Sequence, residues 1–76
     1  MKVKISGVRR IKITGEHIRL DALLKFCNMV MSGGEAKSLI TSGLVYLNGA
    51  PEMQRGKKIR VNDVVRYGNE TVIVIG

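Results

Sequence analysis

The hydrophobic pattern of this 76-residue chain changes period at Leu20 and again after Gly43, and this constrains the fold more than any other feature. Before Leu20, apolar and polar residues alternate, which is typical of strands with one buried face. Between Leu20 and Gly43 the apolar residues recur at helical spacing, and afterwards alternation returns. The sequence therefore predicts one α+β domain, with two short helices packed against a small, mainly antiparallel β-sheet.

Two alternating segments precede the helices. Val3-Lys4-Ile5 and Ile11-Lys12-Ile13 each place one basic residue between two β-branched ones. Such segments are expected to form half-buried strands whose outer faces are basic.

The first helix is predicted from an apolar stripe. Leu20, Leu23, Leu24 and Cys27 fall at positions i, i+3, i+4 and i+7. Asp21 in the first turn suits the positive end of the helix dipole. Because Cys27 belongs to the stripe, we expect a buried structural thiol rather than a nucleophile.

The second helix has a predicted start and a predicted end. Ser32-Gly33-Gly34-Glu35 forms a capping box, in which the Ser32 side chain accepts from the Glu35 N–H and the Glu35 side chain reaches back. Gly43 is a natural left-handed cap at the far end. The apolar face between them consists of Ala36, Leu39 and Ile40.

Strands and turns follow Gly43. Asn48-Gly49 predicts a hairpin, and Pro51 limits its return strand to a short edge. Residues 58–61 and 64–67 are predicted strands that flank Asn62-Asp63, and residues 71–75 form the last one. The expected order is β-β-α-α-β-β-β-β, and the expected core includes Leu20, Leu24, Leu39, Ile40, Val45, Leu47 and Val64.

Composition excludes several classes of site. One cysteine and one histidine, His17, rule out an internal disulfide and leave too few ligands for a structural zinc site. No apolar run approaches the length that spans a bilayer, and no signal peptide is visible, so a cytoplasmic protein without a membrane partner is expected. No paired carboxylates or nucleophile–base set is present. We therefore expect no enzyme activity, no cofactor and no small-molecule substrate.

The net charge indicates an anionic partner. The chain carries 13 Lys and Arg against 6 Asp and Glu, a formal charge of +7. Residues 1–12 hold five of the cations and no acid, and residues 55–60 hold four more. Dense basic clusters on a folded domain are typical of nucleic-acid binding.

An ordered set of residues between about positions 10 and 67 resembles the S4-type RNA-binding domain, the alpha-L motif. The set includes Arg19-Leu20-Asp21, Ser32-Gly33-Gly34-Glu35-Ala36-Lys37, Val45-Tyr46-Leu47-Asn48-Gly49 and Asp63-Val64-Val65. The chain is most similar to small stand-alone bacterial members, which share the Gly33-Gly34 form where many others have Ser-Arg. Asn62 replaces the usual glycine of a turn, and Asn tolerates positive φ. Residues 1–9 extend beyond the pattern as a basic arm.

The resemblance implies a non-catalytic protein that binds structured RNA, with ribosomal RNA or tRNA as the expected class and ribosome assembly or translation as the expected process. By position in the family pattern, the RNA-binding residues would be Arg19, Lys25, Ser32, Gly33, Gly34, Lys37 and Asn48. Electrostatics would extend this surface to Arg55, Lys57, Lys58 and Arg60, with Arg9, Arg10 and Lys12 as additional contacts.

Physical chemistry alone leaves other interpretations open. Glycines at a helix start leave backbone N–H groups bare for a phosphate, and three aromatic residues are too few to read single strands base by base. Two short helices with a glycine-bearing connector also occur in DNA-binding helix-turn-helix proteins. A third, weaker hypothesis is a small sulfur carrier that would use Gly76.

Overall fold

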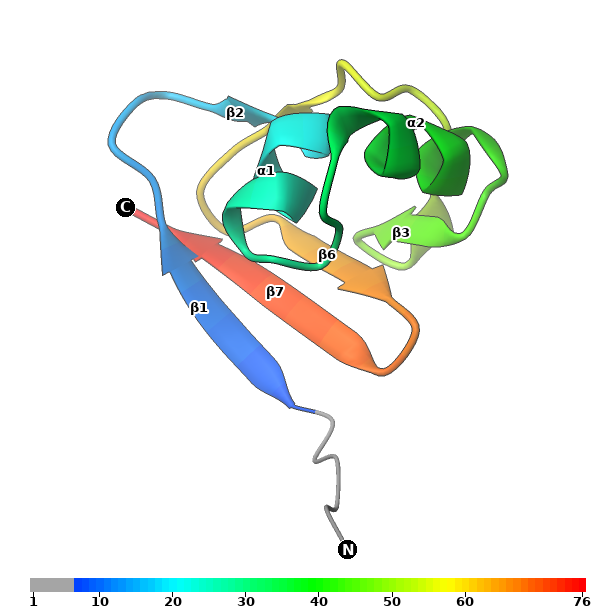
Figure 1. Ribbon diagram of the computed structural model, residues 1–76. Helices are drawn as coiled ribbons and strands as arrows, with labels where there is room; N and C mark the ends of the chain where they lie inside the picture. The colour runs from blue at the N-terminus through cyan, green and yellow to red at the C-terminus, as the bar shows by residue number, and fades with distance from the viewer. Residues whose placement is uncertain (1–6) are drawn as a thin grey trace, which may run out of the picture.

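The computed structural model describes residues 7–76, and in this part of the chain strands flank a central pair of helices (Figure 1). In chain order, the elements are β1 (Val8–Lys12), β2 (Ile18–Arg19), α1 (Leu20–Phe26), α2 (Gly33–Thr41), β3 (Val45–Leu47), β4 (Ala50–Pro51), β5 (Lys58–Ile59), β6 (Val64–Tyr67) and β7 (Glu70–Ile75). The α+β prediction is confirmed. The predicted strand at Val3-Lys4-Ile5 lies outside the described residues.

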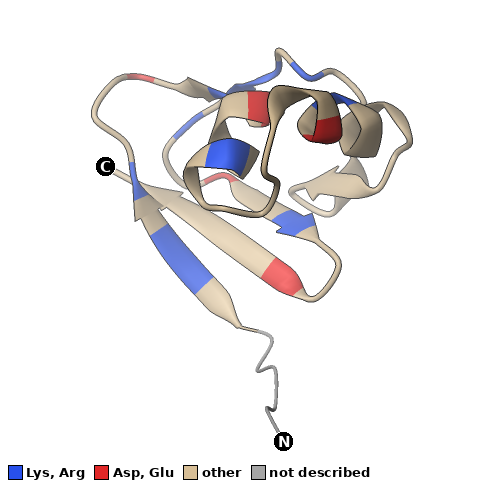
Figure 2. Ribbon diagram, viewed as in Figure 1, with Lys and Arg blue, Asp and Glu red and all other residues tan. Residues whose placement is uncertain are grey.

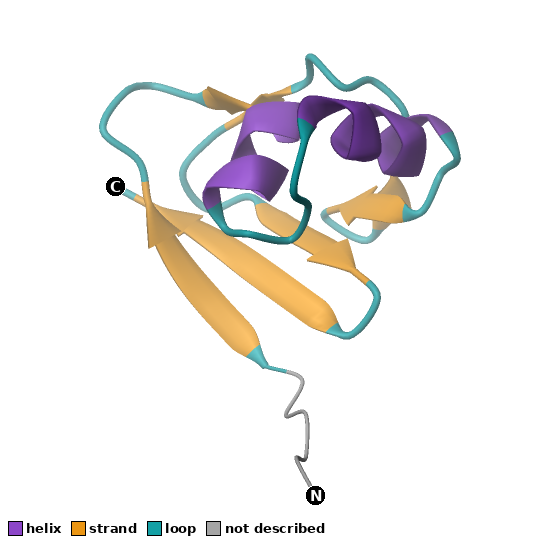
Figure 3. Cartoon of the chain, in the orientation of Figure 1, coloured by secondary structure: helices purple, strands orange, loops and turns teal. Residues whose placement is uncertain are grey.

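Five strands form the main sheet, in the order β1-β7-β6-β3-β4. β1 runs parallel to β7, and the other neighbours are antiparallel. The two helices lie together on one side of this sheet (Figure 3). The edge strand β4 contains Pro51, as predicted, because proline cannot donate to a ladder. β2 and β5 form a separate antiparallel pair beside α1.

The core lies between the helices and the sheet. Leu20, Leu23 and Leu24 of α1 and Ile40 of α2 are fully buried, and so are Val45, Val65, Val72 and Val74 of the strands. Leu39 and Leu47 are partly buried against this cluster. Val64 was expected in the core, but Val65 takes that place. The cross-strand register pairs Val65 with Leu47 and Val72, and this directs Val64 to the opposite face.

Three predicted turns are confirmed by their backbone angles. Asn48 and Gly49 have φ values of 51° and 89°, both positive, as the tight hairpin turn requires. Gly43 ends the second helix region with a φ of 77°, and Asn62 has a φ of 80°. Asparagine therefore supplies the positive φ at position 62.

The strand predicted at residues 58–61 is shorter and lies outside the main sheet. β5 ends at Ile59 and pairs with β2, so Asn62-Asp63 does not close a hairpin with β6. The first two N–H groups of α1 need acceptors, which the Arg55 and Lys57 carbonyls just before β5 provide. This requirement draws the segment away from the main sheet.

Cys27 is a core residue. Its side chain is 3% exposed, and its thiol donates to the Leu23 carbonyl at 3.0 Å. Burial raises the pKa of the Cys27 thiol, and the nearby positive charge of Arg9 opposes that rise. The thiol is therefore protonated and shielded at neutral pH.

We expect the raised pKa of Cys27 to make alkylation slow. At pH 8, iodoacetamide should modify the folded protein on the order of tenfold or more slowly than the urea-unfolded chain, because the thiolate is the reactive species. The folded state also keeps a proton that the unfolded chain releases, so stability should fall as the pH rises above the unfolded thiol pKa. Mass spectrometry measures the alkylation rate, and equal rates in both states would contradict the burial.

Truncation of Leu24 should be the costlier of two matched leucine changes. Leu24→Ala removes a fully buried side chain and should lower the free energy of unfolding by about 2–5 kcal/mol. Leu44→Ala changes a side chain that is half exposed and should cost about 1 kcal/mol or less. Urea denaturation of both variants gives the comparison.

Candidate nucleic-acid interface

The β2–β5 pair brings two distant basic segments together. Arg19 lies opposite Lys58 in the ladder, and Ile18 lies opposite Ile59. The Leu20 N–H donates to the Lys57 carbonyl at 2.9 Å, and the Asp21 N–H donates to the Arg55 carbonyl at 3.1 Å. These bonds hold residues 55–58 against the start of α1.

Four exposed basic residues meet at this place: Arg19, Arg55, Lys57 and Lys58. We call them the helix-side basic cluster. Arg19 forms an ion pair with Asp21 at 3.0 Å, and a Cβ at Gly56 would lie 3.7 Å from the Arg19 guanidinium. Within residues 7–76, the other three members have no ion-pair partner. The cluster therefore keeps most of its positive charge for a partner.

The start of α2 forms a capping arrangement slightly different from the predicted one. The Ser32 hydroxyl accepts from the Glu35 N–H at 3.1 Å, as expected. The Glu35 carboxylate reaches past Ser32 and accepts from the Met31 N–H at 2.7 Å. Both side chains therefore stabilise the helix start whether or not a ligand binds there.

Gly33 and Gly34 are exposed, and the fold gives no packing reason for them. A Cβ at Gly33 would have no neighbour within 4 Å, and a Cβ at Gly34 would meet only the Ser32 Oγ at 3.9 Å. Neither residue has a positive φ. Their N–H groups find no acceptor in the described part of the chain and face open space at a helix start, where the dipole attracts an anion.

Lys25 and Lys37 occupy exposed positions on the packed helix pair, Lys25 in the last turn of α1 and Lys37 on α2. Figure 2 shows basic residues along the loop that passes beside both helices and along β1. Lys25 and Lys37 thus add exposed positive charge to the helix pair.

Asn48 and Arg60 are joined through Asp63. The Asn48 side-chain amide donates to Asp63 Oδ1 at 3.1 Å, and its oxygen accepts from the Val64 N–H at 2.9 Å. The second Asp63 oxygen accepts from the Arg60 N–H at 2.8 Å. Asn48, which the family pattern assigned to RNA binding, therefore has a structural role in linking two turns.

The basic residues of β1 lie at the other edge of the main sheet and divide between its faces. Arg9 is paired with Val72 and faces the helix side, where it forms an ion pair with Glu70 at 3.0 Å. Arg10 and Lys12 alternate with it and point to the open face of the sheet. The structure does not bring this group into the helix-side basic cluster.

The sequence interpretation missed a pocket of about 360 Å³ between β1, the following loop and the end of α1. Phe26 lines this pocket and is 61% exposed. A signal was available, because Phe26 is the one aromatic residue of the first helix and lies off its apolar stripe.

The described residues contain no group of three His, Cys, Asp or Glu side chains that could hold a metal ion. Across the same part of the chain, no helix is long and apolar enough to cross a membrane.

The structural role of Asn48 can be tested apart from any RNA. Asn48→Gly keeps the positive φ but removes both side-chain bonds, so the free energy of unfolding should fall by about 1–3 kcal/mol. Asn69→Gly is the control and should cost less, because Asn69 is exposed and its side chain has no hydrogen bond within residues 7–76. Urea denaturation would contradict the assignment if both variants matched the parent protein.

Comparison with known proteins relates this geometry to a family. The family model of the S4 domain matches residues 11–75. The probable ribosome maturation protein RlbA of Bacillus subtilis is 40% identical over 55 residues, which cover 72% of this chain and 78% of that protein. An uncharacterized RNA pseudouridine synthase of Aquifex aeolicus is 36% identical over 63 residues, which cover 83% of this chain but 20% of that protein.

A solved structure agrees with the fold. The solution structure of YbcJ from E. coli, which is described as revealing an alpha-L motif involved in RNA binding, covers 100% of this chain and 95% of its own. It superposes with a TM-score of 0.67 at 26% sequence identity. The two packed helices, the mainly antiparallel sheet and the match over residues 11–75 lead to one conclusion: this chain belongs to the S4 domain family.

Proposed function

We propose that this protein binds structured RNA without catalysing a reaction, and that the helix-side basic cluster and the start of α2 form the binding surface. The observation that carries the proposal is the β2–β5 pair, which places Arg19 beside Lys58 and holds residues 55–58 at the start of α1. Ribosomal RNA or tRNA is the proposed ligand class, and ribosome maturation or translation in the bacterial cytoplasm is the proposed process. The relatives' names support this choice.

The charge distribution supports phosphate contacts. Arg55, Lys57 and Lys58 are exposed and have no ion-pair partner within the described residues. Asp21, whose N–H donates to the Arg55 carbonyl, has an engaged carboxylate, since it accepts from Arg19 and from the Ala22 N–H. Basic side chains held on a rigid ladder can contact several phosphates at fixed spacing, which suits an RNA recognised by its shape.

The start of α2 supplies a second group of donors. The exposed N–H groups of Gly33 and Gly34 would donate hydrogen bonds to a phosphate at close approach, because no side chain stands in front of them. Lys37, one turn further along α2, adds a positive charge. Lys25 and Arg60 would extend the surface on either side, with Ser32 and Asn48 holding its backbone in place.

The sequence left two alternative functions open, a DNA-binding helix-turn-helix protein and a sulfur carrier, and both can be tested. A helix-turn-helix protein would read DNA bases from its second helix, but the Thr41 hydroxyl of α2 donates to the Lys37 carbonyl at 2.8 Å. This internal bond reduces the polar side chains available to bases. The family match favours RNA binding over the sulfur-carrier hypothesis.

A fluorescence anisotropy titration tests the ligand class. A labelled hairpin of ribosomal RNA and a DNA duplex of equal length are titrated with the protein at several salt concentrations. We expect tighter binding to the RNA and a log–log salt slope of about −4 or steeper, as several phosphate contacts require. Equal or tighter binding to the duplex would favour the DNA-binding alternative.

Charge reversal tests the location of the surface. The double variant K57E/K58E should weaken binding to the RNA hairpin by at least about tenfold, because it removes two phosphate contacts and adds repulsion. R10E/R66E changes the net charge equally, but its positions lie on the open face of the sheet, so it should weaken binding several-fold less.

Circular dichroism checks that both double variants fold. Equal losses in both would show that net charge, rather than this surface, determines the affinity. A larger loss of affinity in R10E/R66E would indicate that the interface lies on the open face of the sheet, where the predicted additional contacts Arg10 and Lys12 lie.

A further inference from the structure

Phe26 has a large aromatic side chain that is not part of the hydrophobic core. The other large apolar residues of α1, Leu20, Leu23 and Leu24, are fully buried, whereas Phe26 is 61% exposed at the end of the helix. An isolated exposed aromatic residue would need no explanation. Phe26, however, forms one wall of the pocket of about 360 Å³.

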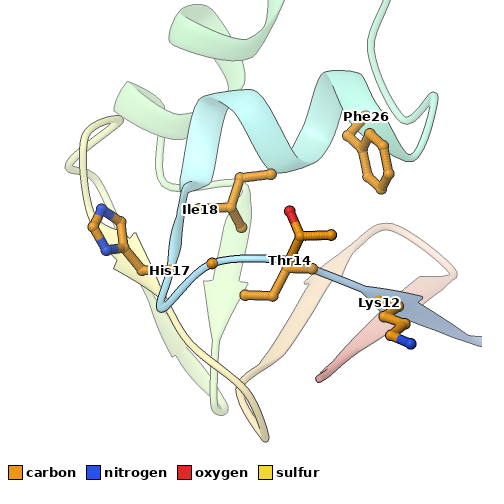
Figure 4. A pocket seen from close by; sticks show the side chains of 7 residues that line it. Lys12, Thr14, His17, Ile18 and Phe26 are labelled. Carbon is orange, nitrogen blue, oxygen red and sulfur yellow. The ribbon is translucent and has the colours of Figure 1, made fainter.

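The opposite wall comes from the segment that joins β1 to β2. Figure 4 shows Thr14 of this segment and Ile18, the first residue of β2, projecting into the space that Phe26 also faces. Ile13, which is 8% exposed, belongs to the core and lines the pocket. An aromatic ring, a branched aliphatic side chain and a hydroxyl thus surround one open hollow.

This set of groups suits a planar heterocycle. A ring can stack on Phe26, and its polar edge can meet the Thr14 hydroxyl, which has no hydrogen-bond partner among the described residues. Gly15 also lines the pocket and leaves it open, because the nearest atom to a Cβ built at Gly15 would be the His17 carbonyl oxygen at 3.9 Å. Unpaired nucleobases combine these two properties, a face that stacks and an edge that forms hydrogen bonds.

The charges around the pocket favour a nucleotide over an apolar protein side chain. Lys25 immediately precedes Phe26 in α1, and Lys12 borders the pocket at the end of β1 with its side chain directed to the open face of the sheet. None of the residues that line the pocket is acidic. A base in the pocket would therefore have the positive charge of Lys25 beside it, where a flanking phosphate can pass.

We propose that this pocket binds a single unpaired RNA base, stacked on Phe26, with Lys25 facing a flanking phosphate. The proposal rests on the proposed function and adds a preference to it. The protein would bind a structured RNA more tightly where one base is bulged out of the helix. One aromatic side chain is enough to stack one base, so the proposal agrees with the small number of aromatic residues in the chain.

Two RNA hairpins that differ in one nucleotide test this proposal. One carries a single bulged 2-aminopurine, a fluorescent adenine analogue, and the other is fully paired. The wild-type protein should bind the bulged hairpin at least about fivefold more tightly, and the 2-aminopurine fluorescence should change on binding. Phe26→Ala should reduce the preference to less than about twofold and abolish the fluorescence change, because the stacking surface is gone.

Two further variants control for folding and for general loss of apolar surface. Phe26→Trp keeps a stacking face and should retain the preference. Met31→Ala alters a side chain that is 90% exposed and does not line the pocket, and it should behave as the wild type.

Equal affinity of the wild type for the two hairpins, with no effect of Phe26→Ala, would contradict base binding in the pocket but would leave the proposed RNA binding intact. An unchanged preference in Phe26→Ala would also contradict base binding in the pocket, because the base would then bind elsewhere. Absence of binding to both hairpins would instead contradict the proposed function itself.

Discussion

The first turn of α1 takes its hydrogen-bond acceptors from residues 55–57, and the position of the basic residues around it depends on this contact. A helix of seven residues is too short to be stable alone in water, and Arg19 at its N-cap makes no side-chain cap. The distant carbonyls satisfy the free N–H groups, and the β2–β5 ladder extends the same contact. The stability of α1 and the assembly of the helix-side basic cluster are therefore two results of one interaction.

Polar side chains in this small domain fall into two groups with different tasks. Ser32, Glu35 and Asp63 accept backbone N–H groups, and Asn48 links the two turns around Asp63. The exposed lysines have no such internal partners within residues 7–76. These polar side chains thus hold the backbone, and the exposed lysines are left for an external anion. This division explains how so short a chain can carry a high net charge and still fold.

Local features were predicted well, and features that depend on distant residues were not. The Ser32 cap, the Asn48-Gly49 turn and the buried stripe of α1 each follow from a few neighbouring residues, and the structure confirms them. The partner of β5 could not be predicted, because it depends on the acceptors that α1 needs. Val64 and Val65 are both β-branched, so the sequence could not decide which one faces the core. The register with Val72 decides it.

The sequence by itself determined the α+β class, the two helices, the turns and the excess of positive charge, because periodicity, capping and positive φ are local properties. Its resemblance to the S4 domain also indicated RNA. Only the tertiary structure decided which cations meet: it joins Arg19 to Lys58 and sends Arg10 and Lys12 to another face. It alone placed Phe26 opposite Thr14 and Ile18. The physical reason is that strand pairing and helix packing connect residues far apart in the chain. The local sequence pattern does not show which distant residues will pair.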